Sequence, residues 1–339
     1  MAAVVADTAA PSVLRPTRWW LGATLALTVA PFVLAVALAP AEGARPGNAL
    51  VWLLFVGSSA HIGATGWFFT VPDVRAHARR HRGRYVVAPT LLVLGTAVAA
   101  VMAPTSWFVD ALLVYFGWQL FHFHKQNLGI AALAARSLHA PSLTTTERRA
   151  LVGAGCGGIL ALLGHPELLR LAPDVRVHGL FEVGALVFLA NVVTGAVAVA
   201  RRPRDARPGS FVAVYAASLL FFAPAFLFSS PYAAVAGLTI AHGLQYLLLL
   251  GMLAGAPVES ATGPRLGVLV LVNIALVGGI LLNQASHLHA AHGLPRALYG
   301  AYLGLVMAHF VVDAGLWRLR DEFPRAFLGR RLPYLLQQG

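Results

Sequence analysis

The fold is decided by stretches such as PYAAVAGLTIAHGLQYLLLLGMLA at residues 231–254, which contains no charged side chain. An α-helix rises about 1.5 Å per residue, so about 20 apolar residues cross the ~30 Å hydrocarbon core of a bilayer. The apolar runs show no alternation of period two, which strands of a membrane barrel require. Because only helices and closed barrels satisfy their backbone in lipid, the stretch predicts a transmembrane helix.

The composition extends this prediction to the whole chain. Of 339 residues, 58% are hydrophobic and 11% are charged, whereas soluble domains carry about 25% charged residues. The lone Cys156 excludes an intrachain disulfide framework. The net charge of +12 lies largely in short loops between apolar runs, as membrane topology requires, and does not indicate nucleic-acid binding. We predict an all-α, polytopic membrane protein whose main partner is the lipid bilayer.

Ten such apolar runs divide the chain. We expect a tail at residues 1–18, one transmembrane domain at 19–318 and a basic tail at 319–339. The predicted spans are residues 19–39, 48–71, 85–103, 107–134, 149–165, 178–200, 210–229, 231–254, 264–283 and 296–318.

The loops alternate in charge. All but four of the 25 Lys and Arg residues lie in one set of loops and tails, and the exceptions are Arg45, Arg170, Arg176 and Arg296. Cytoplasmic loops accumulate Lys and Arg, so we expect both termini in the cytoplasm, with the protein in a bacterial cytoplasmic membrane.

Four histidines lie at matched positions in even-numbered spans. They are the fourteenth, sixteenth, twelfth and fourteenth residues of spans two, four, eight and ten, namely His61, His122, His242 and His309. These spans run in the same direction, so equal position means equal depth to within about one helical turn. Helix bundles build metal sites from inward side chains on different helices. We therefore predict that the four imidazoles bind one metal ion.

Polar residues accompany these histidines at offsets of three or four, which share a helix face. They are Asp313, Gln126, Gln245 and Gln119. Metal-bound histidines usually donate their second N–H to such an acceptor, and Asp313 could itself be a ligand. His124 is expected on another side of its helix, as part of a second site or an alternative ligand. Tyr246 and Tyr115 are candidates for contact with a substrate, although a tyrosine in a span commonly serves packing.

A further group, His287, His289 and His292, lies in a non-cytoplasmic loop. The two interpretations are a solvated loop, which we favour, and an outer metal site at the mouth of a transporter.

The ligand set indicates the chemistry. Imidazoles with a carboxylate nearby suit iron, copper or zinc and disfavour magnesium or calcium. A site at the bilayer centre is reached most easily by a lipophilic isoprenoid or acyl substrate, so the leading hypothesis is a non-haem iron oxygenase or desaturase. Two alternatives remain open: a protein that binds haem b, and a transporter of protons, metals or solutes that uses the intramembrane His and Asp residues.

Four blocks carry the histidines: AHIGAT at 60–65, HFHKQNLG at 122–129, HGLQY at 242–246 and HFVVDAGLWR at 309–318. With its many spans and intramembrane histidines, the chain resembles the bacterial Brp/Blh group, membrane proteins that cleave β-carotene to retinal with histidine-bound iron. The blocks also resemble those of other histidine-rich bacterial membrane proteins. They do not match the Brp/Blh group residue by residue, and its paired histidines one turn apart are missing. The resemblance therefore implies the chemical class alone.

Overall fold

The computed structural model describes residues 11–171, 177–257, 266–290 and 292–336, and every regular element in these ranges is helical. The α-helices are α1 (Pro11–Ala37), α2 (Asn48–Phe55), α3 (His61–Ala64), α4 (Pro72–Arg80), α5 (Ala88–Met102), α6 (Thr105–Ser137), α7 (Thr145–Gly164), α8 (Leu180–Ala200), α9 (Gly209–Leu219), α10 (Pro224–Leu227), α11 (Gly237–Gly255), α12 (Gly267–Ser286), α13 (Leu294–Leu316), α14 (Glu322–Arg331) and α15 (Pro333–Leu336). Three π-helical segments, η1 (Val56–Ala60), η3 (Gly83–Val87) and η6 (Tyr232–Ala236), and two 3-10 segments, η2 (Thr65–Thr70) and η4 (Pro166–Leu169), complete the set.

Seven apolar helical segments of the described chain are long enough to cross a membrane. They are Pro16–Ala37, Asn48–Thr70, Gly83–Met102, Leu180–Ala200, Tyr232–Gly255, Gly267–Ser286 and Leu294–Leu316. The outer faces of α5, α8 and α12 expose large apolar side chains, including Leu91, Leu186 and Leu281. Exposed apolar surface on this scale is compatible with contact to lipid. The structure thus fits a helical membrane protein.

The other three predicted spans also fall on helices, but these are less regular. Residues 107–134 lie within α6 and 149–165 largely within α7. Residues 210–229 were expected to form one helix, whereas α9 ends at Leu219 and α10 begins at Pro224. Proline has no backbone N–H to continue a helix, which explains the break.

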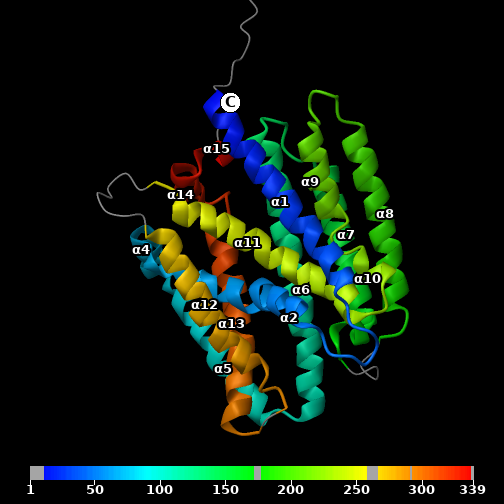
Figure 1. Cartoon of the computed structure of the whole chain (residues 1–339), viewed down its shortest axis with the longest axis vertical. Helices are drawn as coiled ribbons and strands as arrows, with labels where there is room; N and C mark the ends of the chain where they lie inside the picture. Colours follow the sequence, from blue (N-terminus) through cyan, green and yellow to red (C-terminus); the bar gives the residue numbers. More distant parts are fainter. Residues whose placement is uncertain (1–10, 172–176, 258–265, 291, 337–339) are drawn as a thin grey trace, which may run out of the picture.

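The bundle has two sides. Figure 1 shows α5, α12 and α13 on one side and α7, α8 and α9 on the other, with α11 crossing between them. Within the sides, α5 packs along α13 and α7 along α8. The start of α1 and the C-terminal helix α15 lie at the same end of the molecule (Figure 1).

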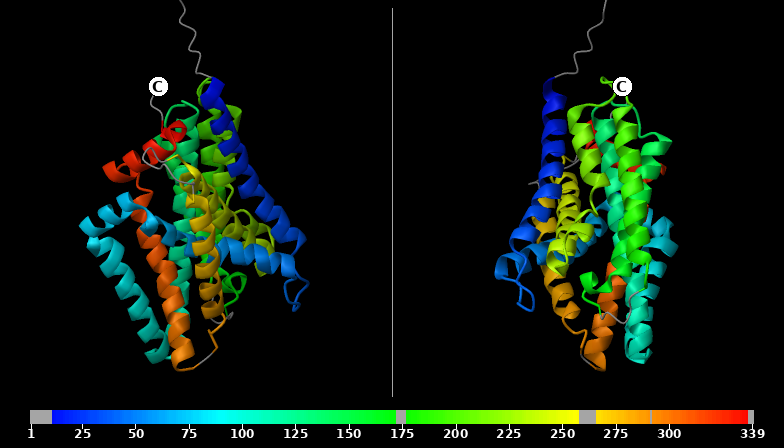
Figure 2. Two further views of the ribbon diagram at one scale, coloured as in Figure 1. Left: turned by 60° about the vertical axis from the view of Figure 1, so that its left-hand side comes forward. Right: turned by 90° about the vertical axis from the view of Figure 1, so that its right-hand side faces the viewer.

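The segment Asn48–Thr70 departs most from the prediction. We expected a regular helix at 48–71, but α2 passes through η1 into α3 and then η2. Figures 1 and 2 show this segment running across the bundle, at a steep angle to α12 and α13. π-Helical turns often occur at functional sites, where they redirect the side chains that follow. His61 is the first residue after η1.

Residues 319–336 are folded onto the bundle. Two short helices, α14 and α15, bury Phe327, Leu328 and Leu335 in the same core cluster as Tyr246 and Leu316. The basic C-terminal segment that we expected as a tail is therefore anchored by apolar contacts through Leu336.

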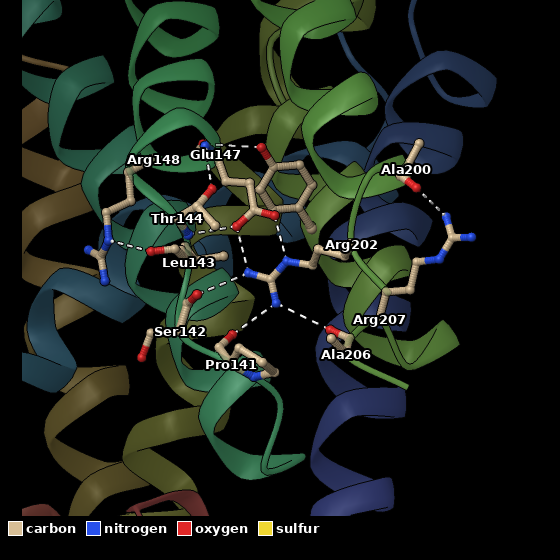
Figure 3. Close-up of polar contacts among 11 residues, drawn as sticks. Pro141, Ser142, Leu143, Thr144, Glu147, Arg148, Ala200, Arg202, Ala206 and Arg207 are labelled. Carbon is tan, nitrogen blue, oxygen red and sulfur yellow. Dashed lines mark hydrogen bonds and ion pairs between the residues drawn. The ribbon is translucent and has the colours of Figure 1, made fainter. Parts of the chain in front are cut away.

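A buried ion pair ties the connection after α6 to the connection after α8. The guanidinium of Arg202 donates to both carboxylate oxygens of Glu147, each at 2.6 Å, and to the carbonyls of Pro141 and Ser142. Figure 3 shows these contacts converging at the start of α7. Glu147 also closes a capping box with Thr144. A bidentate Arg–carboxylate pair of this kind fixes geometry as well as adding energy.

Loss of this pair is expected to destabilise the protein. Arg202→Ala leaves the fully buried Glu147 carboxylate without its partner, which costs about 3–5 kcal/mol for a buried pair. We expect a clearly lower melting temperature in detergent, measured by fluorescence or circular dichroism. The exposed neighbour Arg201 provides the control, because Arg201→Ala should melt like the wild type. Equal melting temperatures for the two variants would contradict the structural role.

The same pair predicts acid sensitivity. Burial raises the pKa of Glu147, but hydrogen bonds from Arg202 and Thr144 outweigh it and hold the pKa below its ordinary value of 4.5. Because the pKa is lower in the folded than in the unfolded state, ionised Glu147 makes its full contribution to the free energy of unfolding above pH 4.5. This contribution is lost as the pH falls through the pKa of the folded state. In the Arg202→Ala variant, this part of the acid destabilisation should disappear.

Candidate metal centre

His61 and His242 reach each other because two glycines let their helices touch. A Cβ on Gly57 would lie 2.5 Å from Cα of Ile240, and a Cβ on Gly243 would lie 2.2 Å from the carbonyl oxygen of Gly57. Small residues at helix crossings allow such close approach in membranes. The glycines thus bring the backbone around η1 against α11, next to both histidines.

The four predicted histidines lie in one cluster, which we call the histidine cluster: His61, His122, His242 and His309. The ring centroids are 5.0 Å apart for His61 and His242, 5.0 Å for His242 and His122, 5.1 Å for His122 and His309, and 5.2 Å for His309 and His61. Each imidazole therefore meets two others, and the four contacts form a closed ring. The rings meet edge to face, at interplanar angles of 71–90°.

These imidazoles have buried nitrogens that make no hydrogen bond in the described chain. His61, His242 and His309 are at most 3% exposed. Within the described chain, Nε2 of all four rings and Nδ1 of His242 make no hydrogen bond. An unsatisfied buried polar atom costs about 1–3 kcal/mol, and such groups are rare in folded proteins. Several at one point indicate that something outside the polypeptide binds there.

The donor atoms suit a metal ion. Ligand atoms of His61, His242 and His309 all lie within 4.8 Å of one another, and so do those of His122, His309 and Asp313. Opposite ligands with bonds of about 2.0–2.2 Å lie up to about 4.4 Å apart. Three ligands of one ion cannot all lie opposite one another, so these side chains must move closer together to bind it. His309 belongs to both groups and joins them.

A chain of hydrogen bonds sets the tautomer of His309. The Tyr246 hydroxyl donates to Oδ1 of Asp313 at 3.0 Å, so at its 2.9 Å contact with Thr65 the tyrosine oxygen accepts from the threonine hydroxyl. Thr65 Oγ1 then accepts from Nδ1 of His309 at 2.7 Å. With its proton on Nδ1, His309 presents the lone pair of Nε2 to the centre, as metal-bound histidines do.

Thr65 is the residue that the sequence did not identify as part of this network. It was noticeable as a polar residue four positions after His61, on the same helix face, but its partner is His309 on another helix. We expect Thr65→Val to weaken metal binding 10–100-fold, as loss of a hydrogen bond to a metal-bound histidine typically does. The measurement is metal retention against a competing chelator.

The control for this variant is Thr70→Val, since the Thr70 hydroxyl donates to the Trp67 carbonyl. It should retain the metal as the wild type does. If Thr65→Val also retains wild-type affinity, the hydrogen bond does not position His309.

Aromatic rings hold two members of the histidine cluster from outside. Phe123 stacks on His242, with centroids 4.1 Å apart, and Phe310 stacks on His122 at 4.5 Å. Both phenylalanines directly follow a cluster histidine in sequence. Asp313 lies beside the cluster, with Oδ2 3.5 Å from Nε2 of His309 and 3.8 Å from Nε2 of His122.

The glutamines do not play the part we expected. The amide of Gln126 donates to the His242 carbonyl at 2.9 Å and to Gln245 at 2.8 Å. Gln245 donates in turn to Thr28 on α1 at 2.7 Å. In the described chain Gln119 Oε1 is buried without a hydrogen-bond partner. Thus Gln126 and Gln245 join α6, α11 and α1, and none of the three glutamines bonds a cluster imidazole.

Two of the remaining predicted residues, His124 and Tyr115, lie apart from the cluster, and the third, Tyr246, lies beside it. His124 packs on Gly155 of α7, so it faces away from His122. Tyr115 belongs to an apolar cluster with Leu303 and Val306, whereas Tyr246 is in the hydrogen-bond chain described above.

The outer histidines are spread over an exposed connection. His287, His289 and His292 are all exposed, and among described residues they do not form a group of converging metal ligands. His287 bonds the Asn283 carbonyl at 2.6 Å, and His289 lies near Tyr299. This arrangement gives no support to the outer metal site and agrees with a solvated loop.

A cavity of about 620 Å³ opens beside the histidine cluster, between α6 and α13. His122, Asp313 and Tyr246 line it, while His61, His242 and His309 do not. The cavity therefore reaches the cluster from the side of His122. Its size lies within the ~300–1,000 Å³ of small-molecule sites.

Comparison with known proteins gave no relative: no family model, no curated protein and no solved structure matches the chain.

Proposed function

We propose that this protein is a membrane-embedded metalloprotein in which His61, His122, His242 and His309 bind one metal ion. The observation that carries the proposal is the set of unpartnered imidazole nitrogens at the centre of the histidine cluster. A bound cation would satisfy these lone pairs together, which no described protein group does. Asp313 would supply negative charge beside the ion or act as a further ligand.

The membrane topology that accompanies this proposal has ten spans and cytoplasmic termini, in a bacterial cytoplasmic membrane. The start of α1 and helix α15 lie at the same end of the bundle (Figure 1), as an even number of crossings requires. The arginine-rich connection between α8 and α9 lies at that end too. Cytoplasmic faces collect such residues.

Iron is the ion we propose, with copper and zinc as the alternatives that metal analysis would distinguish. Imidazole ligands suit all three, and the absence of a thiolate in the cluster disfavours ions that depend on sulfur. Haem fits less well. A haem between two axial histidines needs room for its macrocycle, and here two further imidazoles lie within about 5 Å of each ring.

The reaction we propose is oxidation of a lipophilic isoprenoid or acyl substrate, as an oxygenase or desaturase. When bound, iron would supply the activation of dioxygen, and a desaturase would also need two electrons from an external donor. The protein's own residues do the rest. The cavity binds the substrate beside His122, apolar walls exclude water, and the chain from Asp313 to His309 keeps the Nε2 lone pair directed inward.

Dioxygen uptake tests this reaction. Purified, iron-loaded protein should consume dioxygen when given a lipophilic substrate and a reductant, and Asp313→Asn should lower the rate at least tenfold. Transport of metal ions or protons by proteoliposomes, without any substrate oxidation by the iron-loaded protein, would contradict the proposal and favour the transporter.

A further inference from the structure

The cavity beside the histidine cluster is apolar along its walls and basic at one end. Along α6 its lining runs from Trp118 to Leu133, which is about 22 Å of helix at 1.5 Å per residue. The end near Trp118 also has Phe121 and Phe310, and the middle has His122 and Asp313. Five cations line the cavity beyond His122 and Asp313, and Lys125 is the nearest of them to His122 along α6: Arg84, Lys125, Arg148, Arg318 and Arg320.

These cations are poorly neutralised. Arg318 and Arg320 share one carboxylate, that of Asp321, at 3.8 and 4.0 Å. Among the described residues, Arg84, Lys125 and Arg148 form no ion pair, and the only acidic residue in the cavity lining is Asp313, beside the histidines. Basic side chains gathered at one end of an apolar cavity recognise carboxylate or phosphate groups.

Lys125 is the most informative of the five. It projects from the middle of α6, one turn from His122, and its side chain is exposed. A lysine in a membrane span is costly unless it has a partner or marks the path of a ligand. Its position on the wall of the cavity provides that path.

We propose that the cavity binds an amphiphile with one apolar chain and an anionic carboxylate or phosphate head. The head lies among Lys125, Arg148 and the other basic residues, and the chain extends past His122 towards Trp118 and Phe121. Lys125 lies three residues after His122 on α6, and Arg318 lies five residues after Asp313. At 1.5 Å per residue, the part of the chain that faces the histidine cluster is therefore about 5–8 Å, measured along the helices, from the nearest cations of the head site.

This inference rests on the proposed function for its chemistry, but the binding can be measured without metal. The probe is a brominated C18 fatty acid, because bromine quenches nearby tryptophans and Trp118 and Trp317 line the cavity. In detergent, the acid should quench saturably and be displaced by its unbrominated form. It should bind at least tenfold more tightly than its methyl ester. Trp118→Phe should remove part of the quenching.

The charge variants make the test specific. Lys125→Gln/Arg148→Gln should lower affinity for the acid at least tenfold and leave the ester unchanged, which also shows that the cavity is intact. The control Arg79→Gln/Arg325→Gln removes two exposed charges that do not line the cavity and should bind the acid as the wild type does. Equal affinity of the wild type for acid and ester would overturn the proposal, and so would an unchanged affinity for the acid in Lys125→Gln/Arg148→Gln, the cavity variant.

Two further measurements complete the test. One distinguishes a carboxylate from a phosphate head group, and the other distinguishes this inference from the proposed metal centre. Competition by an alkyl phosphate or by phosphatidylglycerol, again lost in the cavity variant, would support the anionic head and identify its source. The His309→Ala protein should still bind the acid, because His309 does not line the cavity. Failure of charge-dependent binding in a wild-type protein that holds its metal would overturn this inference alone. Charge-dependent acid binding by a wild-type protein that takes up no metal would overturn the proposed metal centre alone.

Discussion

His309→Ala is expected to abolish the metal binding that we propose for the histidine cluster. His309 is the member of the histidine cluster shared by both groups of converging ligands, with His61 and His242 on one side and His122 and Asp313 on the other. Its Nε2 makes no hydrogen bond in the described protein, and Thr65 directs it inward. We expect the metal content to fall from about one ion per chain to below about a tenth, measured by elemental analysis after gel filtration.

The matched control for this variant is His124→Ala. His124 is a buried histidine of α6, two residues from His122, but it packs on Gly155 of α7. Its loss creates a cavity of similar size without removing a proposed ligand, so the variant should melt at lower temperature yet keep its metal. Full metal content in His309→Ala would exclude His309 as a ligand, and equal loss in both variants would attribute the effect to folding.

Gly243→Ala is expected to disrupt the same centre from a distance. The added methyl would lie 2.2 Å from the carbonyl oxygen of Gly57 and 2.6 Å from its Cα. These are backbone atoms, so the two helices must separate, at a cost of about 3 kcal/mol for overpacking. His242 directly precedes Gly243, and His61 lies one turn after Gly57. Separation therefore pulls two imidazoles apart, and both melting temperature and metal content should fall.

Gly251→Ala on the same helix is the control. Outside the backbone of its own helix, a Cβ at this position meets no atom within 4 Å. Alanine favours the helix by up to about 1 kcal/mol over glycine, so this variant should be as stable as the wild type or more stable. A Gly243→Ala protein with wild-type metal content and melting temperature would show that the close approach of η1 to α11 does not set the histidine geometry.

The convergence of the histidines could be anticipated because their depth depends only on position along a span. Two assumptions about the span at 48–71 were wrong, namely that it is a regular helix and that it runs alongside the other even-numbered spans. The segment Asn48–Thr70 is not a regular helix and runs across the bundle (Figure 2). His61 nevertheless reaches the other rings, because glycine contacts with α11 and α12 fix the place where the segment crosses them. Such close contacts between distant segments are not legible in a single sequence.

The partners of the polar residues were harder to predict. Spacing of four residues on one helix places Asp313 beside His309, with Oδ2 3.5 Å from Nε2. It failed for Gln126 and Gln245, which bond each other across two helices, and for Thr65, which bonds a histidine more than 200 positions away. Periodicity describes one helix at a time, whereas these contacts depend on how helices rotate against one another. The basic end of the cavity likewise combines loops and helices far apart in the chain.

The most direct test of the account is metal analysis with X-ray absorption at the metal edge, on protein purified in detergent without chelators. We expect about one iron per chain, no Soret band, nitrogen and oxygen ligands at about 2.0–2.2 Å from the metal, and the more distant scattering that is typical of three or four imidazoles. That signal should be absent from a His122→Ala/His242→Ala variant. A wild-type protein that holds no stoichiometric metal, or one whose metal is bound without imidazole, would contradict the central claim.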